Sequence, residues 1–216
     1  MKVAKKNRIQ GIGTEYSPNR GMSKGATPVR VVASGGSIMG IRDKIKRRLP
    51  IIGAGGNSRK IAWSDKEDFN TWVAAPSNEA GDIELATSGQ CMEAVRTRGG
   101  TIILTDTDTH LATYVGPPYV YSVSRIATNS GAVSRRSAVA VDQGCFWYGQ
   151  ENFFFFDGNT VNTLKCDVHD YVFGDFNEAQ QSKVWGMSVA SHSEIWWFYC
   201  SSNSTEIDRY VAYDYA

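Results

Sequence analysis

Short runs of apolar residues, each closed by a polar turn, follow one another along the chain from Ile61 onward. Three of them, residues 61–65, 102–106 and 153–158, end on an aspartate or on an aspartate followed by glycine. A fourth run, residues 195–200, lacks that aspartate. Runs this short and this rich in aromatic and β-branched residues are typical of strands. The pattern predicts a mainly β fold.

Several runs have a partner across a short polar loop and are expected to form antiparallel hairpins. The pairs are 101–106 with 111–115, 145–148 with 153–156, and 194–200 with 209–215. Run or hairpin centres near residues 63, 104, 150 and 200 recur at about 41, 46 and 50 residues. A four-stranded propeller blade takes about 40 to 50 residues. We therefore expect propeller-like blades, in a complete or incomplete propeller, with a plain β-sandwich as the alternative.

Two helical signals interrupt the strands. Ser64 and Glu67 have the spacing of a capping box and lead into residues 68–72. Residues 176–184 are expected to form a second short helix with Asn177 as its cap. Within the strand at 194–200, Trp196 and Trp197 must point to opposite faces, so one of them should meet another sheet or subunit.

Composition limits the class of protein. The chain has 216 residues, of which 42% are hydrophobic and 21% charged, enough for a packed core. No apolar run approaches the roughly 18 to 20 residues of a membrane helix, so no membrane span is expected. No apolar stretch follows the lysine-rich start, so no secretory signal is expected either.

Charge divides the chain into two parts. Residues 1–60 hold 14 Lys and Arg against 2 acidic residues (+12), and residues 61–216 hold 9 against 20 (−11). Because such an asymmetry indicates physically different segments, we predict a flexible, basic, Gly-rich arm over residues 1–56 and an acidic, propeller-like domain over residues 57–216.

The basic arm contains few elements. Residues 29–33 fit a short strand, and residues 41–49 fit two helical turns ended by Pro50. The candidate contacts with nucleic acid or with a partner are basic side chains: Arg42, Lys44, Lys46, Arg47, Arg48, Arg59 and Lys60. The alternatives are a solvated arm and an arm that docks on the acidic body of another copy. Residues 51–60 match neither phosphate-binding glycine pattern and are predicted to be a flexible linker.

The sequence offers little for catalysis. The histidines His110, His169 and His192 lie beside predicted turns, and no nucleophile, kinase or zinc-protease motif occurs. Residues 106–108 begin like a calcium loop but lack its glycine and glutamate, and residues 167–170 favour a polar turn over a metal site. The four cysteines include no C-x-x-C pair; Cys145 and Cys200 are expected to be buried, reduced thiols. We predict no enzyme activity, cofactor or metal.

An ordered set of motifs resembles a family of structural proteins of tailed bacteriophages, of the tail-nozzle or tail-hub type found in short-tailed phages. The motifs cover about residues 57–216: 61–65, 68–72, 80–82, 114–120, 153–158, 170–173, 194–199 and 208–211. The family has no catalytic site, so the resemblance transfers no site residues. Its members are usually longer, so the chain is either a fragment or a shortened form.

The resemblance implies a virion tail component that is assembled in the host cytoplasm. Its partners would be other tail proteins and copies of itself around the channel through which double-stranded DNA leaves at ejection. An acidic channel wall would repel phosphates and let DNA slide. The alternatives are a nucleic-acid-binding module acting through residues 1–60 and a carbohydrate-binding or hydrolytic tail propeller. In that last case Asp106, Asp108, Asp157 or Asp170 would supply the acid and base.

Overall fold

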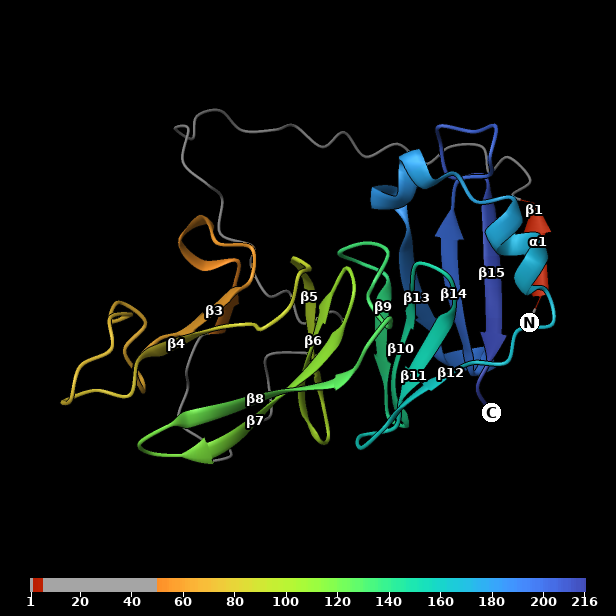
Figure 1. Cartoon of the computed structure of the whole chain (residues 1–216). Coiled ribbons are helices and arrows are strands. Elements are labelled where there is room, and N and C mark those ends of the chain that lie inside the picture. Colours follow the sequence, from red (N-terminus) through yellow and green to blue (C-terminus); the bar gives the residue numbers. More distant parts are fainter. Residues whose placement is uncertain (1, 6–49) are drawn as a thin grey trace, which may run out of the picture.

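The computed structural model describes residues 2–5 and 50–216 (Figure 1). Within these residues the chain is mainly β and forms four antiparallel sheets of three or four strands, which confirms the predicted class. No helix of this described part is long and apolar enough to cross a membrane. The strand predicted at 29–33 and the helix predicted at 41–49 lie outside the described residues.

The first two sheets hold consecutive strands. The first has the order β2-β3-β4 and the second the order β5-β6-β7-β8. Their bounds are β2 Pro50–Ile52, β3 Lys60–Trp63, β4 Gly81–Glu84, β5 Cys91–Thr97, β6 Gly100–Thr105, β7 Thr109–Gly116 and β8 Val120–Ala127. The first sheet is the smaller, with three short strands.

The third and fourth sheets follow, with the orders β12-β11-β10-β9 and β1-β15-β14-β13. Their bounds are β9 Ala138–Val141, β10 Gly144–Tyr148, β11 Phe153–Phe156, β12 Val161–Thr163, β13 Trp185–Val189, β14 Glu194–Tyr199, β15 Arg209–Asp214 and β1 Lys2–Lys5. Strand β1 pairs antiparallel with β15, and the register places Lys5 opposite Arg209. The start of the chain thus completes a sheet built by its end.

The four sheets lie side by side in an open row, with the first and the fourth at opposite ends (Figure 1). The initial strands of successive sheets are neighbours: β2 lies against β5, β5 against β9, and β9 against β13. A two-sheet sandwich would need only one sheet-to-sheet boundary, whereas this row has three.

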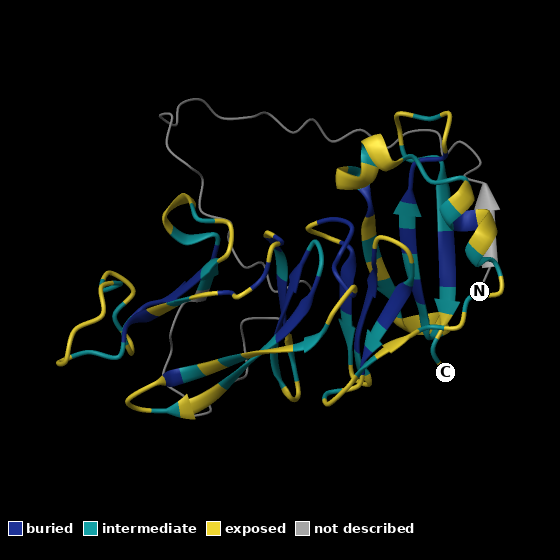
Figure 2. Cartoon of the chain, viewed as in Figure 1, coloured by how far each residue is buried: buried dark blue, intermediate teal, exposed yellow. Residues whose placement is uncertain are grey.

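Each boundary between successive sheets has its own apolar core (Figure 2). Ile52 and Ile61 of the first sheet pack against Ile103 of the second. Trp147 and Phe156 of the third sheet pack against the second sheet. The largest core joins the third and fourth sheets: Val133, Val139, Phe146, Tyr148, Phe153, Val172, Val184, Ile195, Trp197, Tyr199 and Val211.

The predicted hairpins are confirmed. Strand β6 pairs with β7, β10 with β11, and β14 with β15, all antiparallel. Trp196 and Trp197 lie on opposite faces of β14, as expected. The buried Trp197 donates its indole N–H to the carbonyl of Ser137, next to β9, over 2.8 Å. One tryptophan of the pair therefore does meet another sheet.

Residues 51–60 are not the flexible linker that the sequence predicted. They contribute to strand β2, a 3-10 turn η1 over Ala54–Gly56 and the start of β3. The Gly53 N–H donates to the Lys60 carbonyl over 2.8 Å, and Gly53 has a φ of 70°, which favours glycine. The glycines make a hairpin turn, and the predicted boundary at residue 56 falls between two paired strands, β2 and β3.

The helix predicted from Ser64 onward is wrong. The Asp65 carboxylate accepts the N–H groups of Lys66 and Glu79 over 2.7 and 2.8 Å. The Asp68 carboxylate accepts the Asn70 N–H and the Thr71 hydroxyl. Because these local side-chain bonds satisfy the backbone without a helix, the segment forms turns.

Short helices occur only after the third sheet in the described part of the chain, apart from η1. They are α1 His169–Gly174, η2 Glu178–Lys183 and η3 Ala190–His192. Element η2 confirms the helix predicted near 176–184, and the Asn177 side chain accepts the Ala179 N–H at its start. The sequence did not predict α1, whose Val172 packs into the largest core.

Candidate functional site

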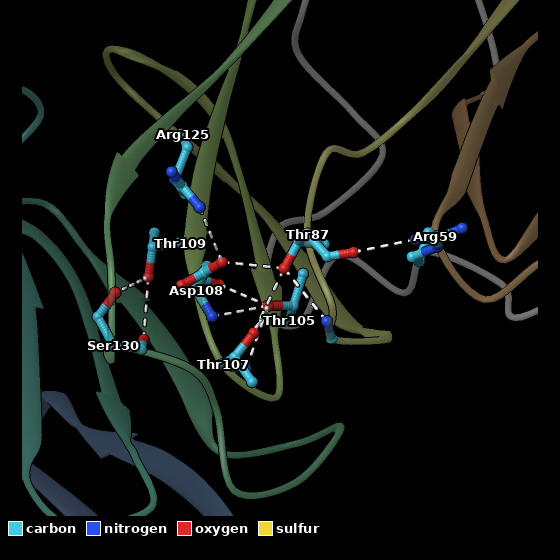
Figure 3. Close-up of polar contacts among 9 residues, drawn as sticks. Arg59, Thr87, Thr105, Thr107, Asp108, Thr109, Arg125 and Ser130 are labelled. Atoms are coloured by element: carbon cyan, nitrogen blue, oxygen red, sulfur yellow. Dashed lines mark hydrogen bonds and ion pairs between the residues drawn. The ribbon is translucent and has the colours of Figure 1, made fainter.

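A cluster of hydroxyl and carboxylate groups ties three connections of the second sheet together (Figure 3). The buried Asp108, from the β6–β7 turn, accepts the Thr87 hydroxyl over 2.9 Å. Its carboxylate also lies 3.6 Å from the Arg125 guanidinium of β8. The Thr109 hydroxyl contacts the hydroxyl and carbonyl of Ser130, in the connection to β9. Residues from β4–β5, β6–β7 and β8–β9 therefore meet at one junction.

The threonine hydroxyls of this junction are occupied. Thr105 accepts the Asp108 N–H over 2.7 Å and donates to the Asp108 carbonyl over 3.0 Å. Thr107 lies within 3.3 Å of both neighbouring threonine hydroxyls. A Cβ at Gly131 would collide with the backbone of Asp106, so a glycine is needed for this close approach. The bonding pattern is that of a structural turn, because the hydroxyls and the Asp108 carboxylate bond one another and the neighbouring backbone.

His110 lies beside this junction, 3% exposed, and among the described residues its Nδ1 has no hydrogen-bond partner. Burial lowers the pKa of its imidazole; Asp108 raises it and Arg125 lowers it. The ring is therefore held neutral at a position between core and junction.

The other aspartates considered as acid or base hold turns or remain exposed. Asp106 accepts the Gln90 N–H over 2.9 Å. Asp157 accepts the N–H groups of Thr160 and Asn159, which lowers the pKa of its carboxyl. Asp170 contacts the His169 ring at 3.0 Å and raises the pKa of that imidazole. Asp106 lies in the β6–β7 turn with Asp108, Asp157 lies between β11 and β12, and Asp170 lies in α1, so these three carboxylates belong to different elements.

Two of the seven predicted basic contact residues are described, and both are ion-paired. Arg59 contacts the Glu84 carboxylate at 2.5 Å and donates to the Thr87 carbonyl over 3.1 Å. Lys60 lies 2.9 Å from the Asp82 carboxylate. The other five lie outside the described residues: Arg42, Lys44, Lys46, Arg47 and Arg48. The described pair thus joins β3 to β4 and its following loop.

A cleft of about 320 Å³ lies between the first and second sheets. The short first sheet leaves part of the second uncovered, and Trp63, Tyr114 and Tyr121 form the aromatic side of the opening. The rings of Trp63 and Tyr121 meet edge to face at 5.2 Å. Arg96 and Arg98 are the charged residues of the lining. Its size falls in the range of small-ligand sites.

Glu93, on β5, is a partly buried carboxylate that faces the third sheet. It accepts the Ala138 N–H over 3.2 Å and so links β5 to β9. Burial raises the pKa of the Glu93 carboxyl to about 8, against the opposing effects of the Ala138 N–H and Arg136. This is the largest pKa shift of a carboxyl group among the described residues, and no local sequence pattern predicts it, because the burial comes from a different sheet.

The cysteines are packing residues. Cys145 and Cys200 are buried, as predicted, and Cys91 is buried as well. Burial raises the pKa of the Cys91 thiol to about 11 and raises that of the Cys145 thiol further. In the part of the chain that the structure describes, no group of three potential metal ligands comes together.

Comparison of the sequence with protein families and with curated proteins assigns no role to these sites. No protein-family model matches the sequence, and no curated protein matches it significantly. The cleft, the Asp108 junction and Glu93 each depend on residues far apart in the sequence. Among these residues, Trp63, Tyr114 and Asp108 lie in segments that the sequence marks, at 61–65, 114–120 and 106–108.

Proposed function

We propose that this chain is a non-enzymatic structural component of a phage virion tail, of the nozzle or hub type around the DNA exit channel. The ordered motifs over residues 57–216 suggest the family. The described chemistry agrees, because the carboxylates and hydroxyls of its polar junctions are engaged in holding turns and strands.

The observation that carries the proposal is the row of sheets. Each sheet packs on the next, and the initial strands β2, β5, β9 and β13 are successive neighbours. That order is expected for blades placed around an axis. We take the row as a propeller-like array in which β1 supplies the outermost strand of the last blade.

Exposed apolar residues at the two ends of the row support a role in assembly. Around the first sheet and the β7–β8 tip these are Phe69, Val73, Tyr114, Val115 and Tyr119. On the fourth sheet, Trp185 stacks on Phe198 at 4.5 Å and Trp196 on Tyr210 at 5.0 Å, on the face opposite the buried Trp197. Grouped apolar side chains of this kind favour contacts with other tail proteins or with copies of the chain.

The charge of the body suits the proposed position. Residues 61–216 carry −11, and a negative wall lets duplex DNA pass without tight phosphate contacts. The protein would be a virion protein, assembled in the host cytoplasm.

The test is to locate the chain in particles. An antibody raised against the purified protein should label one end of the tail in electron micrographs of virions from cells that encode it. Mass spectrometry of purified particles should detect its peptides at a constant ratio to other tail proteins. Absence from particles, or label that follows host debris, would refute the proposal.

A carbohydrate-binding role is the second candidate, because the cleft beside Trp63 presents aromatic side chains of the kind that stack on sugars. Binding of the chain to bacterial surface polysaccharides, lost in Tyr121→Ala, would favour it. Nucleic-acid binding through residues 1–60 is the third. A salt-dependent gel shift by the whole chain that disappears on deletion of residues 1–49 would favour that role instead.

A further inference from the structure

The first sheet has an outer edge to which no described strand is paired. Its order is β2-β3-β4, whereas the other three sheets have four strands. The fourth sheet, too, has only three strands from its own stretch of chain and is completed by β1. Strand β4, Gly81–Glu84, is therefore the edge strand to which an added fourth strand would pair.

The hydrogen-bond register shows which backbone groups this edge offers. The Leu85 N–H donates to the Arg59 carbonyl, and the Lys60 carbonyl accepts from Gly53 of the opposite neighbour. Because bonded pairs alternate in an antiparallel ladder, the backbone groups of Ile83 and Gly81 face β3. The N–H and C=O groups of Asp82 and Glu84 face outward, away from the sheet, and can bond an added strand.

A groove of about 490 Å³ runs beside this edge. On its far side lies the β7–β8 tip, with Pro118 and Tyr119, and Tyr119 is 78% exposed. The charged residues of its lining are Glu79 and Asp82, both acidic; the remainder is largely apolar. An extended segment that carries both apolar and basic residues would complement this lining.

We infer that the edge of β4 accepts, as a fourth strand, the N-terminal segment Lys2–Lys5 of a second copy of this chain. That segment already forms the outermost strand of a sheet in this structure, so it has the required conformation. Its sequence, Lys-Val-Ala-Lys, has a basic residue on each side of two apolar residues, a composition that suits an acidic and largely apolar lining.

Register supports the exchange. An antiparallel strand on β4 that sets Lys2 opposite Glu84 sets Val3 opposite Ile83 and leaves Lys5 opposite Gly81. Ala4 then lies opposite Asp82, so this register brings together one pair of opposite charges, Lys2 with the Glu84 that also contacts Arg59, and one apolar pair, Val3 with Ile83.

Reach is sufficient. The 44 residues numbered 6–49 connect β1 to β2 and can span roughly 145 Å when extended. The N-terminal segment of one molecule can thus pair with its own β15 or with the β4 edge of a neighbouring molecule. Assembly by this route is reversible and rises with protein concentration.

The test uses the full-length chain and a fluorescein-labelled peptide with the sequence of residues 1–8. Asp82→Pro removes the outward N–H without touching a bond to β3, since proline is tolerated at a sheet edge. Asp82→Ala is the matched control, because it also loses the Lys60 ion pair but keeps the N–H. Fluorescence anisotropy should show the peptide binding wild type and D82A within about threefold, and D82P at least tenfold more weakly.

A peptide with glutamate in place of Lys2 and Lys5 should bind wild type at least tenfold more weakly. In sedimentation velocity, wild type and D82A should self-associate with rising concentration, whereas D82P should remain monomeric. If D82P does not fold, Glu84→Pro with Glu84→Ala as control repeats the test at the other outward position.

Peptide binding that is equal in D82P and D82A would place the peptide on the β15 edge and overturn the inference. A failure to bind wild type, or self-association that is unchanged in D82P, would do the same. These outcomes are independent of the particle-labelling test. If the chain is found in phage tails but the peptide does not bind the β4 edge, only this inference is refuted and the proposed function stands.

Discussion

The two ends of the sheet row are built differently. Between the third and fourth sheets, Trp197, Tyr148, Tyr199 and Phe153 are fully buried and pack ring against ring. Around the first sheet the core is mainly aliphatic, as at Ile52 and Ile61, with Trp63 as its buried aromatic residue, and a cleft and a groove remain open beside it.

The difference indicates that one end of the row mainly stabilises the fold and the other end is suited to binding. Aromatic packing contributes most of the buried area at the fourth-sheet end, so that end can hold the row together. The first-sheet end leaves strand edge and apolar surface uncovered, and those are the features through which proteins associate. Four measurements sharpen or break this contrast.

The largest effect is expected from a tryptophan at each end. Trp197→Ala should lower the free energy of unfolding by about 3 to 5 kcal/mol, because it leaves a cavity in a closed core. Trp63→Ala should cost less, about 1.5 to 3 kcal/mol, because the emptied space joins an open cleft and fills with water. Urea unfolding followed by circular dichroism measures both. Equal losses would show that the two ends are equally closed.

The junction beside the second sheet should tolerate little change. Gly131→Ala should cost about 1 to 3 kcal/mol, because a Cβ there collides with the backbone of Asp106 and Thr107. Gly174→Ala is the control, since its Cβ would meet no atom within 4 Å. Thermal unfolding of the two variants would contradict the close approach if their midpoints were the same.

The raised pKa of the Glu93 carboxyl should make the free energy of unfolding depend on pH. Its pKa is about 8 in the fold and near 4.5 in the unfolded chain, so the folded state binds the extra proton between these values. Stability is therefore fully present below pH 4.5 and declines as the pH rises to about 8. Glu93→Gln should remove this decline, a difference of about 1 to 3 kcal/mol between pH 5 and pH 8. Parallel stability curves for wild type and E93Q would contradict it.

The smallest effect is expected at the first sheet. Arg59 and Glu84 form an ion pair whose side chains are 44% and 49% exposed. A double-mutant cycle with Arg59→Ala and Glu84→Ala should give a coupling of about 0.2 to 1 kcal/mol, falling with added salt. A coupling above 2 kcal/mol would mean that this end is held by charge and is more rigid than its sparse core indicates.

Local features were predictable from the sequence and distant ones were not. The hairpins at 101–115 and 145–156 were predictable because two apolar runs and the polar loop between them lie within twenty residues of sequence. Asn177 was found because a cap acts on the next two residues. The Ser64 helix failed because Asp65 is engaged by Glu79, fourteen residues away, which a local pattern does not show.

The candidate sites depend even more on distance. Asp108 accepts a hydrogen bond from Thr87, which precedes it by 21 residues, and Glu93 is buried by a sheet that begins at Ala138. The segment 51–60 looked like a linker because its glycines break any period, yet the same glycines form the turn that lets β2 meet β3. Composition alone does not distinguish these two uses of glycine.

The pairing of β1 with β15 has a consequence for how the protein is made. Strand β1 leaves the ribosome before β15, which is synthesised more than 200 residues later. At roughly 5 to 20 residues synthesised per second, β1 remains without its partner strand for on the order of ten seconds or more. On a polysome, the strand that waits is also the strand most able to engage a finished molecule nearby, so translation itself would favour exchange between neighbouring chains.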